Sequence, residues 1–338
     1  MTSLYKKFLF VFCTLVVSCG LLVTGSSCGE KVDCTKKPDK VTYTWKKTTA
    51  PKKVSLYAAS MPTSKMAWVV GKDGTILHSS DGGASWKAQT SGVSVTLYGV
   101  FFLEDAKHGW AVGEKGTILQ TTNSGESWKK LPEPTTATIR SVYFLQKETG
   151  FVAGDEFTYL RTSNGGRIWS PIMPSNKINL YAVAYHSNAL GYVAGSLGSL
   201  FYTSRNDPTQ MTTAVTGTNK TFRALAIVNE SEAWVVGEEG MVRFSEDSGS
   251  SWDKKFIKAN AFLTGIGFVS EYIGWAVGKG GLLYGTVDKG QRWSPEPGIS
   301  GLPDLHGIYV KKHHGLAVGE DGVIALLQND LSDACKHQ

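Results

Sequence analysis

Arginine is scarce in this chain of 338 residues: it occurs only seven times, and lysine carries most of the net charge of +6. There is no arginine-rich cluster with interleaved aromatic residues, which argues against a nucleic-acid-binding surface. Neither Cys-x-x-Cys nor His-Glu-x-x-His occurs, so no metal and no other cofactor is expected. After the first 28 residues, no segment is apolar enough to span a bilayer, and none has a sustained helical period.

Glycine, by contrast, is abundant, with 38 residues, and it marks a repeat. The phrase Trp-Ala-Val-Gly and its variants return seven times at intervals of 41 or 42 residues. The closing glycines are Gly71, Gly113, Gly154, Gly195, Gly237, Gly278 and Gly319. A run of β-branched and aromatic residues precedes each copy, beginning at Leu56, Leu97, Ile139, Leu180, Phe222, Leu263 and Leu305. Seven copies with almost no insertions indicate a repeat protein.

Each copy has the signals of four short antiparallel strands. In the second copy these are expected at residues 97–102, 109–113, 116–122 and 127–131. Gly113 and Gly116 bracket a tight turn, where glycine is expected to supply a positive φ. Four strands in about 40–45 residues form one blade of a β-propeller. The sequence therefore predicts an all-β, seven-bladed propeller of four-stranded antiparallel blades, forming one domain over residues 41–330.

The turn between the third and fourth strands has the pattern Ser/Thr-x-Asp/Asn-x-Gly-x-x-Trp. Its acidic or amide residue is Asp81, Asn123, Asn164, Asp247 or Asp288. A short Asp or Asn side chain accepts hydrogen bonds from turn amides, and the tryptophan buries apolar area where blades meet. The pattern resembles the Asp-box, or BNR repeat, of sialidases and other propellers, where its role is structural. The fourth copy, with YTSRNDPTQM, has neither the glycine nor the tryptophan and is expected to form an irregular hairpin.

The seventh copy stops before its fourth strand. The missing strand is found at the other end of the chain, where TYTWKKTTAP (42–51) is similar to GESWKKLPEP (125–134). We therefore expect residues 41–48 to pair into the last blade, with Trp45 in the place that Trp128 takes in the second. Such pairing would close the ring and remove an open sheet edge.

The five cysteines lie near the ends of the chain. Cys34 precedes the closing strand and Cys335 follows the last blade, so a disulfide between them is a candidate clip. In the entropic account, closing a loop of about 300 residues would stabilise the fold by about 3–5 kcal/mol. Two unrelated thiols at the chain ends are the alternative.

Residues 1–28 have the layout of an export signal: two lysines, a hydrophobic run and then small residues. Two cysteines are candidates for lipidation as in bacterial lipoproteins. Cys19 is favoured by the small residues before it, in VVSC, and Cys28 is favoured by the polar sequence that follows it. If Cys28 is the lipidated residue, Cys34 and Cys335 are left as an even pair. Plain cleavage and an uncleaved anchor stay open. A lysine-rich linker (29–40) and a C-terminal tail (331–338) would flank the propeller.

One set of equivalent positions is a candidate binding ring. The second residues of the seven inner strands are Tyr57, Tyr98, Arg140, Tyr181, Arg223, Thr264 and His306. In a propeller these positions lie at one height around the axis, and Tyr and Arg are favoured at binding hot spots. Packing between blades, with polar tips at the tunnel mouth, is the alternative.

Catalytic patterns are missing. A sialidase needs an arginine triad, a Tyr–Glu pair and a loop acid, and no such set is found; the loops are also short, so no deep pocket is expected. His313 and His314 occupy the turn that holds His108 in the second copy, and they are expected to be exposed turn residues rather than metal ligands.

The repeats GWAVGEKGTILQTTNSGESW and GWAVGKGGLLYGTVDKGQRW resemble those of the photosystem II stability/assembly factor family. The resemblance covers nearly all of residues 41–330 and the lipoprotein-like leader. It implies a non-enzymatic assembly chaperone that binds newly made reaction-centre protein through an arginine-rich patch, to which Arg140 and Arg223 would correspond. It also implies a lipid-anchored location, on the thylakoid lumen side in a photosynthetic host and otherwise in the periplasm or at the cell surface.

The expected function is thus that of an exported, membrane-anchored and monomeric propeller that binds another protein, such as a subunit of a membrane complex, without catalysis. A sialidase-like propeller that binds or hydrolyses glycans is the first alternative, and a structural or adhesive surface module is the second.

Overall fold

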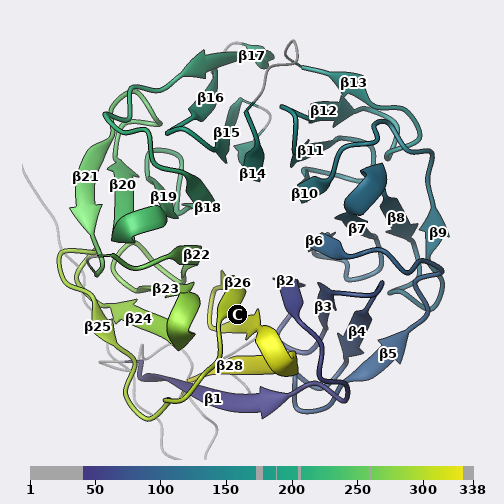
Figure 1. The fold of residues 1–338 in the computed structure, drawn as a ribbon, viewed down its shortest axis with the longest axis horizontal. Helices are drawn as coiled ribbons and strands as arrows, with labels where there is room; N and C mark the ends of the chain where they lie inside the picture. The colour runs from purple at the N-terminus through teal and green to yellow at the C-terminus, as the bar shows by residue number, and fades with distance from the viewer. Residues whose placement is uncertain (1–40, 173–177, 188, 205–206, 259, 330–338) are drawn as a thin grey trace, which may run out of the picture. The chain divides into compact units, whose positions relative to one another are not determined.

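A computed structural model describes residues 41–172, 178–187, 189–204, 207–258 and 260–329. These residues form seven four-stranded antiparallel sheets arranged around a central axis (Figure 1). The predicted seven-bladed propeller is confirmed. No helix of the described residues is long and apolar enough to cross a membrane.

Each blade runs from an inner strand at the axis to an outer strand at the perimeter (Figure 1). Blade 1 contains β2 (Leu56–Ser60), β3 (Ala67–Gly71), β4 (Ile76–Ser79) and β5 (Lys87–Gln89). Blade 2 contains β6 (Leu97–Phe102), β7 (Gly109–Gly113), β8 (Ile118–Thr121) and β9 (Lys129–Lys130). Blade 3 contains β10 (Ile139–Phe144), β11 (Gly150–Gly154), β12 (Tyr159–Thr162) and β13 (Ser170–Pro171). Blade 4 contains β14 (Leu180–Ser187), β15 (Leu190–Gly195), β16 (Leu200–Ser204) and β17 (Asp207–Thr213).

Blade 5 contains β18 (Phe222–Ile227), β19 (Ala233–Gly237), β20 (Met241–Ser245) and β21 (Asp253–Phe256). Blade 6 contains β22 (Leu263–Phe268), β23 (Gly274–Gly278), β24 (Leu282–Thr286) and β25 (Ser294–Pro295). Blade 7 contains β26 (Leu305–Lys311), β27 (His314–Gly319), β28 (Val323–Asn329) and, from the start of the domain, β1 (Tyr43–Thr49). Single 3₁₀ turns follow the second strand of four blades: η1 (Glu114–Gly116), η2 (Glu238–Gly240), η3 (Lys279–Gly281) and η4 (Glu320–Gly322).

The ring closes as predicted, because β1 pairs antiparallel with β28 over seven residues. Trp45 is opposite Leu327 in this ladder and is 5% exposed. Its ring meets that of Trp275 edge-on at 5.7 Å, as Trp252 meets Tyr192 at 5.7 Å between blades 5 and 4. Trp45 thus fills the place of a turn tryptophan, and the prediction for the closing strand is confirmed.

Aromatic columns join neighbouring blades. Trp68 of blade 1 stacks on Phe102 of blade 2 at 3.6 Å, and Trp128 meets Phe102 edge-on at 5.8 Å. The same arrangement recurs one blade further on, where Trp110 stacks on Phe144 at 3.5 Å. Buried aromatic pairs are worth about 0.5–1.5 kcal/mol beyond their buried area. The repeated tryptophans therefore stabilise the packing of each blade against its neighbour.

Of the two glycines predicted to supply a positive φ, Gly116 does so and Gly113 does not, which corrects half of that prediction. Gly113 is extended, with φ −168°, and its role is close packing: a Cβ there would lie 2.1 Å from the carbonyl oxygen of Thr96. The same clash, at 1.9–2.4 Å, would occur at all seven closing glycines. The positive φ values belong to the two residues of the turn itself, Lys115 (φ 55°) and Gly116 (φ 66°).

Blade 4 differs from the other blades, as expected. The register of the β16–β17 hairpin shifts between Thr203 and Ser204, and its outer strand β17 is seven residues long. The irregular hairpin predicted for YTSRNDPTQM is therefore confirmed.

Several predictions fall outside the described residues. These are the export signal with Cys19 and Cys28, the linker 29–40, the tail 331–338 and the bridge between Cys34 and Cys335. They stay predictions from the sequence.

Candidate functional site: a ring at the tunnel mouth

A β-bulge places the candidate ring residue in every blade. The register between the inner strand and the second strand skips the second inner residue in all seven sheets, for example between Leu97 and Gly99 in blade 2. The skipped residues are Tyr57, Tyr98, Arg140, Tyr181, Arg223, Thr264 and His306, and all seven line one cavity on the axis. A bulged residue is released from the alternation of the strand and can be re-aimed.

The side chains of the ring are stacked in sequence around the mouth. Tyr57 lies between His306 and Tyr98, with ring centroids 5.0 and 4.9 Å away. The guanidinium of Arg140 lies over Tyr98 at 5.0 Å and over Tyr181 at 5.5 Å. Arg223 continues the series over Tyr181 at 4.1 Å.

The series of stacked side chains ends in blade 6, at residues that are not among the seven ring positions. Phe262 lies under Arg223 at 5.2 Å and under Lys279 at 4.6 Å. Cation–π contacts of this kind contribute about 0.5–2 kcal/mol each. Ring stacking and cation–π contacts thus join the ring residues of all blades except the sixth, and they reach blade 6 through Phe262 and Lys279. The ring residue of blade 6, Thr264, instead donates a hydrogen bond to the carbonyl oxygen of Leu305 in blade 7 at 2.7 Å.

A second tier of acidic residues supports the ring. The residue after each closing glycine is acidic in four blades: Glu114, Asp155, Glu238 and Glu320. Asp155 accepts two hydrogen bonds from Arg140, from Nε at 2.6 Å and from Nη2 at 2.8 Å. Burial by itself would lower the pKa of Arg140, but the hydrogen bonds and charge of Asp155 outweigh it and raise that pKa. Arg140 is therefore a fixed, paired cation.

Arg223 is held less firmly. Its Nη2 lies 3.5 Å from Glu238 Oε1, and its Nε is buried without a hydrogen-bond partner among the described residues. The side chain is 29% exposed. A buried donor without an acceptor is costly. Of the two arginines, Arg223 is the one with spare hydrogen-bonding capacity.

Burial favours the neutral forms of two other ring residues, His306 and Tyr98. Burial lowers the pKa of His306, whose Nε2 lies 4.0 Å from Glu320 Oε1. Burial, and then the charge of Glu114, raise the pKa of the Tyr98 hydroxyl. Glu114 itself accepts a hydrogen bond from the backbone N–H of Thr96 at 3.0 Å. The mouth thus presents aromatic rings and hydrogen-bonding groups, with two arginines set against the carboxylates of the second tier.

The tunnel behind the ring is narrow. Its cavity of about 220 Å³ is walled below the ring by small and aliphatic residues such as Ala58, Gly99 and Val142. This space fits one side chain or a chain end, whereas typical small-molecule sites have about 300–1,000 Å³. The ring lies at the face that carries the turns between second and third strands, since its acidic supports stand in those turns.

The Asp-box residues lie on the opposite face, in the hairpin turns between third and fourth strands. Ser79 Oγ donates to Asp81 and accepts from the amide of Gly83, at 2.8 Å in both cases. In each of the five turns the Asp or Asn side chain accepts from the amide four residues later; the residues are Asp81, Asn123, Asn164, Asp247 and Asp288. Their acceptor oxygens thus bind the backbone of their own turns.

The histidines of the last hairpin are not exposed turn residues, which corrects the prediction. His314 Nε2 is 2.9 Å from the carbonyl oxygen of Met61 in blade 1, and His313 Nδ1 is 2.8 Å from the hydroxyl of Tyr43. Burial lowers the pKa of both. The sequence did not show that the closing strand and blade 1 would pack over this turn. The described residues hold no group of three or more His, Cys, Asp or Glu that could bind a metal.

A sizeable hollow lies outside the ring, although no deep pocket was expected. It has about 880 Å³ and lies between blades 1 and 2, next to the 90–95 loop. In blade 2 the residue that follows β9 is Leu131, which is 4% exposed. Its counterpart Gln89 instead bonds across to Trp128 Nε1 at 3.1 Å and to the carbonyl oxygen of Ser124. The polar Gln89 of blade 1 thus stands where blade 2 has a buried leucine.

Comparisons with known proteins agree on one family and one fold. A sequence model described as "Photosynthesis system II assembly factor YCF48" matches residues 25–122, 91–179 and 183–328. A solved structure described as "YCF48 bound to D1 peptide" has a TM-score of 0.72 at 19% identity, covering 85% of this chain and 97% of that chain. YCF48 from Cyanidioschyzon merolae has a TM-score of 0.71 at 18% identity, covering 84% and 99%.

A more distant likeness is the WD40 beta propeller domain of Doa1, with a TM-score of 0.69 at 12% identity, covering 87% of this chain and 98% of that chain. No curated protein matches the sequence. At identities this low, the solved structures show the shared fold alone.

Proposed function

Because the chain belongs to the YCF48 family of photosystem II assembly factors, we propose that it binds another protein, a subunit of a membrane protein complex, and assists the assembly of that complex. The solved relative bound to a D1 peptide makes a reaction-centre subunit the reference partner class. A single copy carries the complete ring, so one chain is the binding unit.

The observation that carries this proposal is the ring of bulged residues at the tunnel mouth. Seven bulges bring aromatic and cationic side chains together at one face, and Tyr and Arg are the residues most favoured in binding hot spots. The Nε donor of Arg223 has no hydrogen-bond partner among the described residues. A segment of partner chain laid across the mouth would stack on the tyrosines and bring an oxygen to Arg223.

We further propose that the ring is not catalytic. The carboxylates at the mouth are engaged in holding it: Asp155 binds Arg140, and Glu114 binds the backbone of Thr96. A glycosidase needs two carboxylates poised on a substrate, and a sialidase needs three arginines. Only two inner-strand arginines occur here, which does not favour the glycan alternative.

We also propose that the protein is exported and held at a membrane through its N-terminal segment, on the thylakoid lumen side in a photosynthetic host and otherwise in the periplasm or at the cell surface. The support is the leader sequence with Cys19 and Cys28. The chain enters the propeller at Tyr43, beside His313, on the face opposite the ring. An anchor at that end leaves the ring accessible. Labelling with a radioactive fatty acid, in the native chain and in Cys28→Ser and Cys19→Ser variants, tests lipidation.

Binding of overlapping synthetic peptides that tile D1 tests the partner proposal, with fluorescence anisotropy as the readout. Arg223→Gln is expected to weaken the best peptide at least about tenfold, which corresponds to about 1.4 kcal/mol. Lys312→Gln, on the opposite face, is the matched control and is expected to change nothing. Unchanged affinity in a folded Arg223→Gln variant would reject the ring as the docking site, and no binding of any D1 peptide would reject this partner class.

A further inference from the structure

The outer strands of a propeller are exposed sheet edges, and six of the seven are guarded in this protein. Lysine points outward from the outer strands of blades 7, 1, 2 and 5, with Lys46, Lys87, Lys129 and Lys254 all exposed. In blades 3 and 6 the outer strand has only two residues and ends in proline, at Pro171 and Pro295. Lysine, proline and short length are the usual protections against pairing with a foreign strand.

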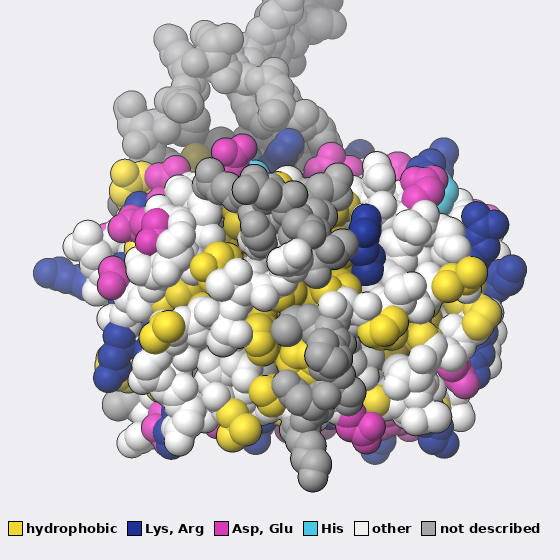
Figure 2. All heavy atoms as spheres, turned by 90° about the horizontal axis from the view of Figure 1, so that it is seen from above, with side chains coloured by type: hydrophobic (Ala, Val, Ile, Leu, Met, Phe, Trp, Pro, Cys, Tyr) yellow, Lys and Arg dark blue, Asp and Glu magenta, His cyan; other side chains and the backbone are white. Residues whose placement is uncertain are grey.

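The outer strand of blade 4, β17 (Asp207–Thr213), has no such guard over most of its length. It is seven residues long, as long as β1, but it contains no lysine or arginine. Its only proline, Pro208, lies near the tip of the hairpin. Gln210, Thr212 and Thr213 are exposed. Figure 2 views the perimeter from the side of blades 3 and 4, and the described side chains in its middle are mainly uncharged, with dark-blue groups mostly toward the flanks.

The free edge of β17 presents backbone groups. The amide of Ala214 donates to the carbonyl oxygen of Leu200 at 2.8 Å, which fixes the direction of the neighbouring groups. Because backbone groups alternate along an antiparallel ladder, the N–H and C=O groups of Thr213 and Met211 point away from β16. Among the described residues no strand pairs with that edge, since β17 is the last strand of its sheet.

We propose that β17 is a self-association edge, at which a second copy of this chain pairs its own β17 antiparallel and joins two blades into one eight-stranded sheet. A two-fold axis makes such an interface self-complementary, so each strand must tolerate its own sequence opposite itself. The stretch Gln210–Thr213 satisfies this because it carries no charge that would face its like. Placing Met211 opposite Thr213 of the partner subunit, in both directions, satisfies the outward groups of both residues.

The same argument excludes the other long outer strand from this role. Pairing of β1 with its own copy would bring Lys46 and Lys47 against the same lysines, and like charges on facing strands are destabilising. The C-terminal end of the described chain is also badly placed to cover β17, since β28 and β17 lie on opposite sides of the ring (Figure 1). The small contact expected for two strands points to a weak, reversible dimer.

Sedimentation velocity of the full chain in detergent tests the proposal over about three decades of concentration centred on the micromolar range, where so small an interface dissociates. The native chain is expected to pass from monomer to dimer. Thr212→Lys introduces an exposed lysine like those on the outer strands of four other blades, and it is expected to weaken association at least tenfold. Thr44→Lys places the same exposed charge on β1 and is the matched control, expected to leave association unchanged. All variants share the hydrophobic N-terminal segment, so its contribution cancels.

Hydrogen exchange at the amides of Met211 and Thr213 gives the second readout. Protection that rises with protein concentration supports the paired edge. Protection that is independent of concentration would mean that another part of the same chain covers β17, and this would overturn the proposal. Rapid exchange at every concentration, or a dimer that is insensitive to Thr212→Lys, would overturn it as well. Peptide binding at the ring is measured separately, so failure of the dimer leaves the partner proposal untouched.

Discussion

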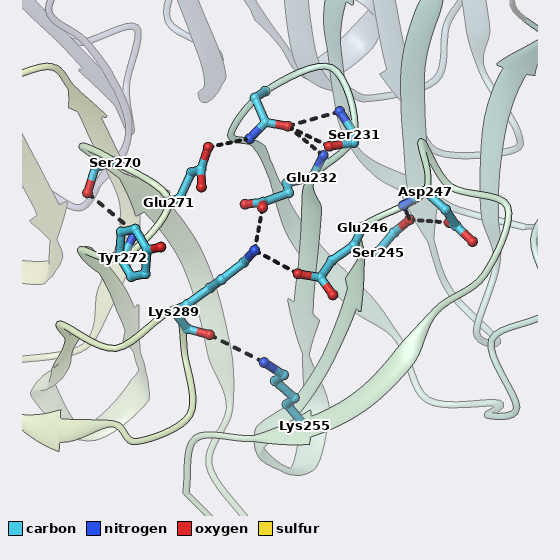
Figure 3. A network of polar contacts seen from close by, with 11 residues as sticks. Ser231, Glu232, Ser245, Glu246, Asp247, Lys255, Ser270, Glu271, Tyr272 and Lys289 are labelled. Carbon is cyan, nitrogen blue, oxygen red and sulfur yellow. Dashed lines mark hydrogen bonds and ion pairs between the residues drawn. The ribbon is translucent and has the colours of Figure 1, made fainter.

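Removal of the Lys289 ammonium should destabilise the junction of blades 5 and 6. Lys289 Nζ lies 2.5 Å from Glu232 Oε1 and 2.7 Å from Glu246 Oε1 (Figure 3). The two carboxylates differ in environment, because the side chain of Glu232 is 7% exposed and that of Glu246 is 57% exposed. Hydrogen bonds to Glu232 and then to Glu246 raise the pKa of Lys289, so the ammonium stays charged throughout the neutral range.

The expected loss in a Lys289→Met variant comes mainly from Glu232. Leaving one partner of a buried ion pair without its counter-charge costs about 3–5 kcal/mol. Glu246 regains water and adds little, and Lys289 is itself 25% exposed. The lower end therefore applies, about 3 kcal/mol. At about 2–4 °C per kcal/mol for chains of this size, the Tm should fall by about 6–12 °C.

Urea unfolding and calorimetry measure this loss, and two further variants separate its causes. Glu246→Gln should cost less than about 1 kcal/mol, as is usual for an exposed pair. Lys289→Met combined with Glu232→Gln should regain much of the loss, since no buried charge is left unpaired. A single Lys289→Met variant that loses less than about 1 kcal/mol, or a double variant no better than the single, would refute the assignment of the cost to the buried carboxylate.

Three further substitutions test other parts of the account. Arg243 is 3% exposed and has no carboxylate partner among the described residues, and blades 1 and 2 have Leu77 and Leu119 at the equivalent position. Arg243→Leu should therefore leave the free energy of unfolding unchanged or raise it by up to about 2 kcal/mol. A clear drop of the Tm in a melting experiment would contradict this. Trp45→Ala should lower the free energy of unfolding by about 3–5 kcal/mol and open the pairing of β1 with β28. Hydrogen exchange should then become fast in blade 7 only. Global unfolding without this local opening would speak against the closing role of Trp45. Hydrogen bonds from the Ser85 hydroxyl, then from the Ser85 amide and from Ser79, lower the pKa of Asp81 to about 2. The stability that the ionised carboxylate adds is therefore present above about pH 4 and is lost as the pH falls through about 2. NMR titration of the carboxyl checks the pKa, and Asp81→Asn should flatten this part of the curve of stability against pH.

The propeller could be predicted from the sequence because its signals are local and repeated. The turn pattern at Asp81 and its counterparts is read within eight residues, and each later copy confirms the one before. The closing strand was also predictable, since Trp45 lies in a stretch similar to that around Trp128. What the repeat could not give was the reason for its own glycine: the contact of Gly113 with the Thr96 carbonyl joins two strands and leaves no trace in local pattern.

The candidate site was only half visible in the sequence. The ring positions could be aligned, but the bulge that lifts them into the tunnel depends on the register of two strands, which no single strand encodes. The different states of Arg140 and Arg223 were hidden for a similar reason. Asp155 and Glu238 stand at equivalent positions, and it is their distances from the arginines, 2.6 Å against 3.5 Å, that identify a paired guanidinium and an under-satisfied one.

The pairing of β1 with β28 also sets an order on biosynthesis. The ribosome makes β1 before any other strand and its partner after all the others, so the circle stays open until the last blade has been translated. A nascent or prematurely terminated chain holds an arc instead, with His306 missing beside Tyr57 and the rim interrupted. The complete set of side chains around the tunnel mouth is thereby assembled only when the last blade has been made and closed by β1.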